Sequence, residues 1–371
     1  MRDPDRPAPF DPSVSAVMLR RMRVLVVGGT GFLGPPVVRR LSNLGHQVTI
    51  YHRGEHEAQL PFGVRHVHSA QAATPILFFP EELTELAWDV VLAMSPIGER
   101  DSSHLMTTFR GIARRVVALS SGDVYRAYGV FLGSEPGDPD PGPLTEDAPL
   151  RENFFPYRGT GGLPAHLADY EKIHVERIIQ SDPALPGTIL RLPAVYGPGD
   201  RQHRFGPPWR RIADGRPAIL IGRAQAAFRW THGYVEDVAH AIVLAVTTER
   251  ARGRVYNVGE ASTPTIAGRV EAFGRAIGWG GRIAILDESR LPTALATAGN
   301  FAQPLACDTS RIRRELDWSE VTPPEEAFRA TAQWEEGSSS GRAGETAPDY
   351  AAEDAALESD PAPSRVAGSG T

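Results

Sequence analysis

The chain has very little of three features that would place it in other classes of protein. Only one of its 371 residues is cysteine, so an intrachain disulfide and a multi-cysteine metal site are excluded. The formal net charge is -6, which leaves no positive excess to displace the counterions of a nucleic acid. No apolar run approaches the ~20 residues that span a bilayer, and no signal-peptide core follows the N-terminus. We therefore expect a cytoplasmic protein with no nucleic acid, membrane or metal as partner.

Lysine is also nearly missing. Of the 39 basic residues only Lys172 is a lysine, and the others are arginines. An ammonium on a flexible stem has a chemistry that a guanidinium lacks, so the retention of Lys172 points to a specific role. Chance retention is the alternative.

The length and the 41% content of hydrophobic residues allow a sizeable core in one large or two modest domains. Residues 1–21 mix proline, aspartate and arginine without periodicity and predict a disordered leader. Residues 336–371 are rich in serine, glycine, alanine, proline and acidic residues, and they predict a disordered tail. The folded part is expected between these segments.

The most informative stretch is an apolar strand, residues 24–27, that runs into a glycine-rich turn. Gly28 allows a sharp turn, Gly31 removes a side chain where backbone approaches a pyrophosphate, and Gly34 lets the following helix pack closely on the strand. The helix N-terminus then faces the phosphates. We predict a dinucleotide site that includes Gly28, Thr30, Gly31, Phe32, Leu33 and Gly34.

The end of the second strand, residues 47–51, bears on the choice of cofactor. No acidic residue stands there to bind a ribose 2′-hydroxyl, and His52 is followed by Arg53. This pattern favours a 2′-phosphate, hence NADP, with both residues in the cofactor site. The alternative is that Arg53 points to water and the protein takes NAD.

The glycine spacing and several later stretches resemble the extended short-chain dehydrogenases/reductases, the NAD(P)-dependent epimerase/dehydratase family. The matching stretches are an aspartate entering a strand (89–94), Ser-Ser-Gly-Asp-Val-Tyr (120–125), Leu-Arg-Leu-Pro-Ala-Val-Tyr-Gly-Pro-Gly (190–199) and Tyr-Val-Glu-Asp-Val (234–238). The resemblance implies an α/β fold, a doubly wound (Rossmann) parallel sheet with a smaller C-terminal α+β substrate lobe.

The implied boundaries follow the family. Residues 22–195 would form the Rossmann domain, with a returning segment near 228–258, and residues 196–227 and 259–335 would form the substrate lobe. Within these parts we expect a strand over 228–234 that joins the main sheet and a small lobe strand over 255–259. A homodimer is expected, because family members often dimerise through two helices per subunit.

The resemblance also implies roles for single residues. Ser121 falls on the serine that hydrogen-bonds the reacting oxygen of the substrate, and Lys172 falls on the lysine that binds the nicotinamide ribose. Pro193 and Val195 would border the nicotinamide. Ala194 replaces an asparagine that is common in enzymes acting on nucleotide sugars, which weakens that class of substrate.

The expected proton donor is missing from its usual place. The family carries a tyrosine four residues before the lysine, and here that position is Ala168. Tyr170 lies only two residues before Lys172, which is about 200° around a helix. Three accounts stay open: Tyr170 serves because the helix starts after it; another group serves; or no acid acts here, including no reaction at all. The other groups are Tyr157, His166 and Tyr125.

We therefore predict an NAD(P)-dependent oxidoreductase or epimerase that acts by hydride transfer at a hydroxyl or ketone carbon of a small polar substrate, either sugar-like or a natural product. Ser121, Lys172 and Tyr170 are the predicted catalytic residues. The alternatives are a nucleotide-binding protein without turnover and a dehydratase that uses its cofactor transiently.

Overall fold

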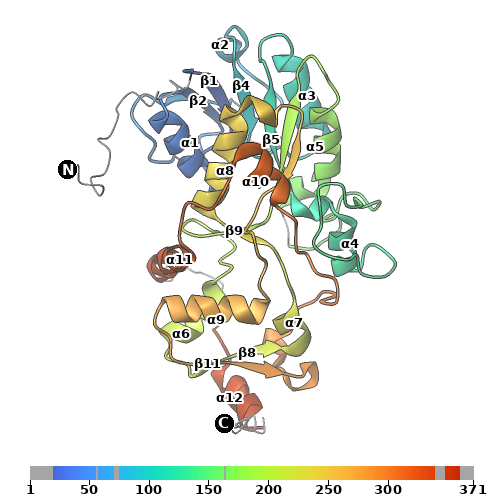
Figure 1. Cartoon of the computed structure of the whole chain (residues 1–371), viewed down its shortest axis with the longest axis vertical. Helices are drawn as coiled ribbons and strands as arrows, with labels where there is room; N and C mark the ends of the chain where they lie inside the picture. Colours follow the sequence, from blue (N-terminus) through green and yellow to red (C-terminus); the bar gives the residue numbers. More distant parts are fainter. Residues whose placement is uncertain (1–19, 56, 71–74, 163, 339–346, 360–371) are drawn as a thin grey trace, which may run out of the picture.

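The computed structural model describes residues 20–55, 57–70, 75–162, 164–338 and 347–359. Its larger lobe is built on a sheet of seven strands, all parallel (Figure 1). In spatial order they are β10 (Val255–Asn257), β6 (Gly187–Leu192), β5 (Val116–Ser121), β4 (Val90–Ala93), β1 (Arg23–Val27), β2 (Gln47–His52) and β3 (Arg65–His68). The order reverses between β4 and β1, which is where doubly wound sheets bind their ligands.

Helices cover both faces of this sheet. α1 (Gly34–Asn43) packs beside α8 (Val235–Thr247) on one face, and α3 (Glu99–Phe109) beside α5 (Lys172–Ile179) on the other. Along β1, Val24 and Val26 belong to the core under α1, whereas the alternate residues belong to the core under α3. Burial on both faces explains why β1 reads as a continuous apolar run. The doubly wound fold predicted from the sequence is confirmed.

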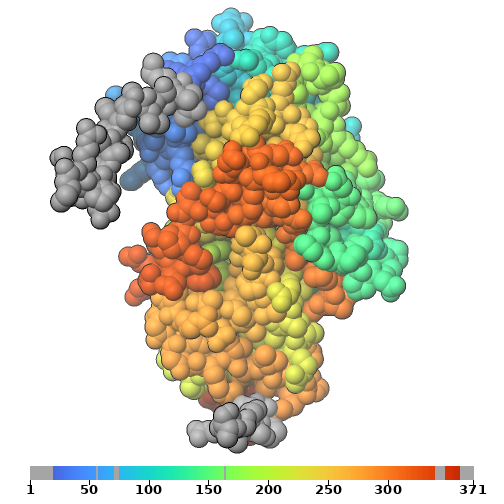
Figure 2. Space-filling model, viewed as in Figure 1, coloured from blue at the N-terminus to red at the C-terminus, as the bar shows by residue number. Residues whose placement is uncertain are grey.

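The smaller lobe lies below the sheet in Figures 1 and 2. It contains two parallel strands, β8 (Ala218–Gly222) and β11 (Arg282–Leu286). Around them lie α6 (Gly206–Ala213), α7 (Arg223–Ala227), α9 (Ile266–Ala276) and α12 (Tyr350–Glu358).

The remaining elements of the described residues are short helices and one longer helix in the C-terminal part of the chain. They are α2 (Glu81–Thr84), α4 (Arg126–Leu132), α10 (Ser310–Leu316), α11 (Pro324–Ser338) and the short 3₁₀ helices η1 (Gly122–Val124), η2 (Ala165–Asp169), η3 (Glu249–Ala251), η4 (Glu288–Arg290) and η5 (Thr293–Leu295). Within the described ranges, none of the helices is long and apolar enough to cross a membrane.

Two strand predictions were wrong. β9 (His232–Tyr234) does not join the main sheet but pairs with β7 (Ala194–Tyr196) in a separate two-stranded sheet. Pro193 separates β6 from β7, and because proline has no N–H and a fixed φ, the chain leaves the main sheet there. Conversely, β10 is not a lobe strand, since it pairs with β6 at the edge of the main sheet.

The predicted disorder after residue 336 was also wrong for part of the tail. α11 runs to Ser338, and α12 lies against β8 and β11, where Ala356 and Leu357 join an apolar cluster. The buried Glu353 accepts a hydrogen bond of 3.1 Å from Arg211 Nε. These tertiary contacts order a segment whose composition alone predicts disorder. Most of the predicted leader, residues 1–19, lies outside the described residues.

Candidate active site

The glycine turn forms one wall of a cavity of about 230 Å³ at the carboxyl end of β1. Gly28 has φ of +98°, a conformation that side chains rarely adopt, so the sharp turn needs glycine. A Cβ on Gly34 would lie 2.2 Å from the backbone of Gly29, whereas a Cβ on Gly31 would meet nothing within 4 Å. The three glycines thus have the conformations and spacing that a dinucleotide-binding turn requires.

The other predicted residues of this turn divide into two groups. Thr30 lines the cavity. Phe32 packs against Gly199, since a Cβ added to Gly199 would lie 3.1 Å from the Phe32 ring. Leu33 directly precedes the first turn of α1. Both apolar side chains pack against the core under α1, so their side chains support the turn.

His52 and Arg53, at the end of β2, also line the cavity. The Arg53 guanidinium forms an ion pair of 3.0 Å with Glu55, a third lining residue. Sequence reasoning examined only the strand end and missed this carboxylate. The cavity wall therefore carries both a group suited to a 2′-phosphate and a group suited to a 2′-hydroxyl.

A second cavity of about 620 Å³ opens at the carboxyl end of β5. Its polar lining residues include Ser121, Asp123, Tyr157 and Tyr170. Other lining residues are Pro193, Ala194, Arg204, Trp230 and Cys307. Burial raises the pKa of Cys307 to about 12, so its thiol is a poor nucleophile.

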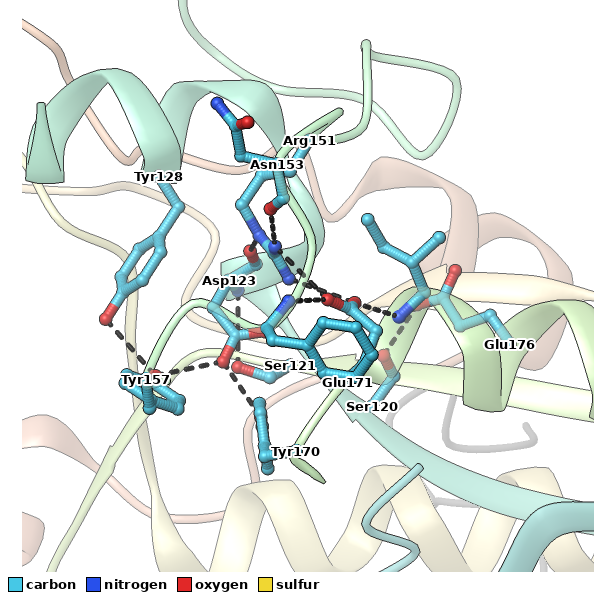
Figure 3. A network of polar contacts seen from close by, with 12 residues as sticks. Ser120, Ser121, Asp123, Tyr128, Arg151, Asn153, Tyr157, Tyr170, Glu171 and Glu176 are labelled. Carbon is cyan, nitrogen blue, oxygen red and sulfur yellow. Dashed lines mark hydrogen bonds and ion pairs between the residues drawn. The ribbon is translucent and has the colours of Figure 1, made fainter. Parts of the chain in front are cut away.

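Asp123 is the centre of the polar network in this cavity (Figure 3). Its Oδ2 accepts hydrogen bonds from the hydroxyls of Tyr170 at 2.8 Å and Tyr157 at 3.1 Å. Its backbone N–H donates to Ser121 Oγ at 3.2 Å. Oδ1 is buried and has no hydrogen-bond partner among the described residues. Burial raises the pKa of Asp123 above its usual range, although the hydrogen bond from Tyr170 acts to lower it.

Tyr170 lies before α5 and is not part of it. η2 ends at Asp169, Glu171 is the N-cap whose carboxylate accepts the Ile173 N–H at 2.9 Å, and α5 begins at Lys172. The argument that Tyr170 and Lys172 point to opposite faces applies only within one helix, so it does not hold here. The Lys172 ammonium instead lies 5.3 Å from the centre of the Tyr170 ring.

Lys172 is buried and contacts a lining residue of each cavity, Pro96 of the first and Tyr170 of the second. Its ammonium donates to the carbonyl oxygen of Pro96, which lines the first cavity, and to that of Leu119 at 3.2 Å. Burial lowers the pKa of Lys172 to about 8, although Asp123 and Asp101 oppose this change. The side chain predicted to hold the ribose therefore adjoins the glycine cavity.

A buried ion pair holds the network in place from behind. Arg151 and Glu171 have side chains without solvent exposure, and their charged groups lie 3.1 Å apart. Arg151 Nε also donates to the backbone oxygen of Asp123. One ion pair thus fixes both the segment that carries Asp123 and the N-cap that follows Tyr170.

The remaining candidates from the sequence lie elsewhere. His166 is exposed on η2, and Tyr125 is buried with its hydroxyl donating to Asn257 at 2.7 Å. Val195 packs in the core under α1. Asp123 was missed, although an ionisable residue directly after a buried strand, two positions past Ser121, was a readable signal.

A stretch of the sequence and the fold are both similar to those of known proteins. Residues 105–259 match the model of the NAD dependent epimerase/dehydratase family, and the seven-stranded sheet has the corresponding doubly wound order. The match covers less than half of the chain, so the chain is similar to this family over these residues.

Two reductases are among its relatives. Over 243 residues the chain is 28% identical to the 2′-dehydrokanamycin reductase of Streptomyces kanamyceticus, across 62% of this chain and 60% of that protein. It is 29% identical over 243 residues to the 3-diazoavenalumate denitrifying reductase of a Streptomyces species, across 62% of this chain and 73% of that protein. The first match thus spans less than two thirds of the relative.

Among solved structures, the chain is similar to the UDP-glucuronic acid 4-epimerase of Bacillus cereus in complex with UDP-glucuronic acid and NAD. The TM-score is 0.60 and the identity 16%, across 85% of this chain and 99% of that one. This likeness shows the fold.

Proposed function

We propose that the protein is an NADP-dependent oxidoreductase that reduces a ketone, or oxidises the corresponding alcohol, on a small polar natural product. One observation carries the proposal: Ser121 and Tyr170 both hydrogen-bond to Asp123 in one cavity, and the ammonium of Lys172 lies next to Tyr170 and bonds Pro96 of the glycine cavity. The two reductase relatives favour a reductase over an epimerase. The homodimer implied by the family resemblance stays a prediction.

The glycine cavity fits a nicotinamide nucleotide. The space beside Gly31 is open to a pyrophosphate, and Arg53 is placed for a 2′-phosphate if its ion pair with Glu55 opens. Lys172 donates to two carbonyls and has a third N–H for a ribose hydroxyl. When bound, the nucleotide supplies or accepts the hydride.

Proton transfer falls to this chain's own groups. In the reductive direction the substrate oxygen gains a proton as the carbonyl carbon gains hydride. Burial raises the pKa of Tyr170 well above its ordinary value, so a lasting phenolate is unfavourable. Tyr170 therefore gives its proton to the substrate oxygen, which Ser121 holds, and takes one from protonated Asp123. For this step the hydrogen bond between Tyr170 and Asp123 reverses, so that the carboxyl group donates to the phenol oxygen.

The unpartnered Oδ1 of Asp123 supports this assignment. A neutral carboxyl group loses less by being buried without a partner than a carboxylate does, so burial of Oδ1 stabilises the protonated acid relative to the carboxylate. The raised pKa of Asp123 has the same physical cause. Asp123 is thus the acid that returns a proton to Tyr170.

The pH dependence of reduction tests the role of Asp123. Since the raised pKa of Asp123 keeps the acid protonated to a higher pH than usual, kcat should be high below that pKa and fall as the pH rises through it. Asp123→Asn should lower kcat by roughly 10²-fold and remove this alkaline decline, with little change in KM. Retention of the wild-type pH profile in Asp123→Asn would show that another group returns the proton to Tyr170.

A turnover assay tests the function itself. The purified protein is mixed with NADPH or NADH and a panel of ketones that includes aminoglycoside-like and aromatic natural products, and absorbance of the reduced nicotinamide is followed. We expect loss of absorbance, faster with NADPH. Lys172→Ala should weaken nucleotide binding and abolish turnover. Nucleotide binding without oxidation in any mixture would favour the non-catalytic alternative, and product without net absorbance change would favour the dehydratase.

A further inference from the structure

Three histidines and a glutamate gather at the edge of the main sheet, outside the proposed proton-transfer network. They are His52 at the end of β2, His66 and His68 on β3, and Glu57 on the connection between these strands. One potential ligand atom from each lies within 4.8 Å of all the others.

Strand register explains why the three imidazoles meet. β2 and β3 are parallel, with Ile50 opposite His66 and His52 opposite His68. Side chains two residues apart point to the same face of a strand. Ile50 belongs to the core under α1, whereas Val67, between the two histidines, belongs to the core under α3. All three imidazoles therefore stand on the α1 face.

The distances are close to those of a metal site. His52 Nε2 lies 3.3 Å from His66 Nδ1, and the carboxylate of Glu57 lies 3.6 Å from His66 Nδ1 and 2.9 Å from His68 Nε2. A tetrahedral zinc ion with bonds of about 2.0–2.1 Å separates its ligand atoms by about 3.3 Å. Small side-chain movements would bring the widest pair to that spacing.

The donor set also selects the kind of ion. Three imidazole nitrogens and one carboxylate oxygen suit Zn²⁺ and similar first-row ions, whereas Mg²⁺ and Ca²⁺ prefer oxygen ligands. The cluster is not sealed, since His68 and Glu57 are exposed.

We propose that His52, Glu57, His66 and His68 form a binding site for one Zn²⁺ ion or a similar divalent transition-metal ion. The ion ties the connection after β2 to the edge strand β3. The inference is independent of the proposed function. The sequence prediction of no metal site considered only cysteines, because these histidines come together only through strand pairing.

Coordination changes one contact beside the cofactor cavity. His52 Nδ1 accepts the Gly54 N–H at 3.2 Å, which places the ring proton on Nε2, the nitrogen that faces His66. An ion on Nε2 moves that proton to Nδ1 and releases the Gly54 N–H. Gly54 and His52 both line the glycine cavity, so the proposed metal site and the cavity share His52.

The test uses the full chain without an affinity tag, because polyhistidine binds the same ions. Zn²⁺ is titrated calorimetrically, and Co²⁺ is added to record the visible absorption of a tetrahedral site. We expect one equivalent of Zn²⁺ to bind, the Co²⁺ bands to appear, and Zn²⁺ to raise the melting temperature. Mg²⁺ should give none of these effects.

Two variants decide the assignment. The double variant His66→Ala/His68→Ala should bind Zn²⁺ at least tenfold more weakly and lose the Co²⁺ bands and the thermal shift, while its circular dichroism stays that of the wild type. His240→Ala, which removes a half-buried histidine on α8, is the matched control and should behave as wild type. Wild-type Zn²⁺ affinity in the double variant, or no Zn²⁺ binding by the wild type at micromolar concentration, overturns the proposal.

Discussion

Tyr170→Phe should lower kcat for ketone reduction by about 10²–10⁴-fold and leave nucleotide binding nearly unchanged. The variant keeps the ring, with the Lys172 ammonium 5.3 Å from its centre, and removes the hydroxyl that bonds Asp123 at 2.8 Å. The loss therefore falls on the proton path. Stopped-flow measurement of single turnovers and a fluorescence titration with NADPH separate the two effects.

Tyr157→Phe is the matched control. It removes the other hydroxyl on Asp123 Oδ2, at 3.1 Å, and leaves Tyr170 in place. We expect a fall in kcat below tenfold, because Tyr170 still links Asp123 to the substrate oxygen. If the larger loss instead follows Tyr157→Phe, then Tyr157 is the proton donor and our assignment of Tyr170 is wrong.

Glu171→Gln should lower the free energy of unfolding by about 3–5 kcal/mol. The substitution leaves the Arg151 guanidinium charged, fully buried and without its ionic partner. It also weakens the N-cap of α5, where the carboxylate accepts the Ile173 N–H. Urea unfolding followed by circular dichroism measures the change, and kcat should fall too, because Arg151 and Glu171 position Asp123 and Tyr170.

Asp287→Asn provides the comparison for that measurement. Asp287 pairs with Arg223 at 2.7 Å, and both side chains are more than half exposed. Because solvent screens an exposed ion pair, the free energy of unfolding should change little. Equal destabilisation by the two substitutions would contradict the special role that we give to the buried pair.

The sequence predicted several strands of the main sheet well because each has an apolar run that can be recognised locally. β1 (Arg23–Val27), β2 (Gln47–His52) and β4 (Val90–Ala93) lie within one residue of the predicted strands. The errors occurred where tertiary pairing decides the outcome. β9 and β10 are three residues each, and the residue pattern of so short a strand does not indicate which sheet it joins.

For the candidate site, sequence reasoning found Ser121 and Lys172 by resemblance and left the proton donor open. It had no means to place the start of α5, because Glu171 becomes an N-cap through an ion pair with Arg151, twenty residues away. It missed Asp123, whose importance comes from two tyrosines that the fold brings to it.

The sequence by itself determined the strand, glycine turn and helix at the start of the chain, because Gly28 and Gly34 meet requirements of local backbone geometry. Only the tertiary structure decided which side chains share a site. Tyr170 meets Asp123, and His52 meets His66 and His68, through strand order and buried charge pairing. Such contacts join residues that are far apart in the chain, so a local sequence pattern does not predict them.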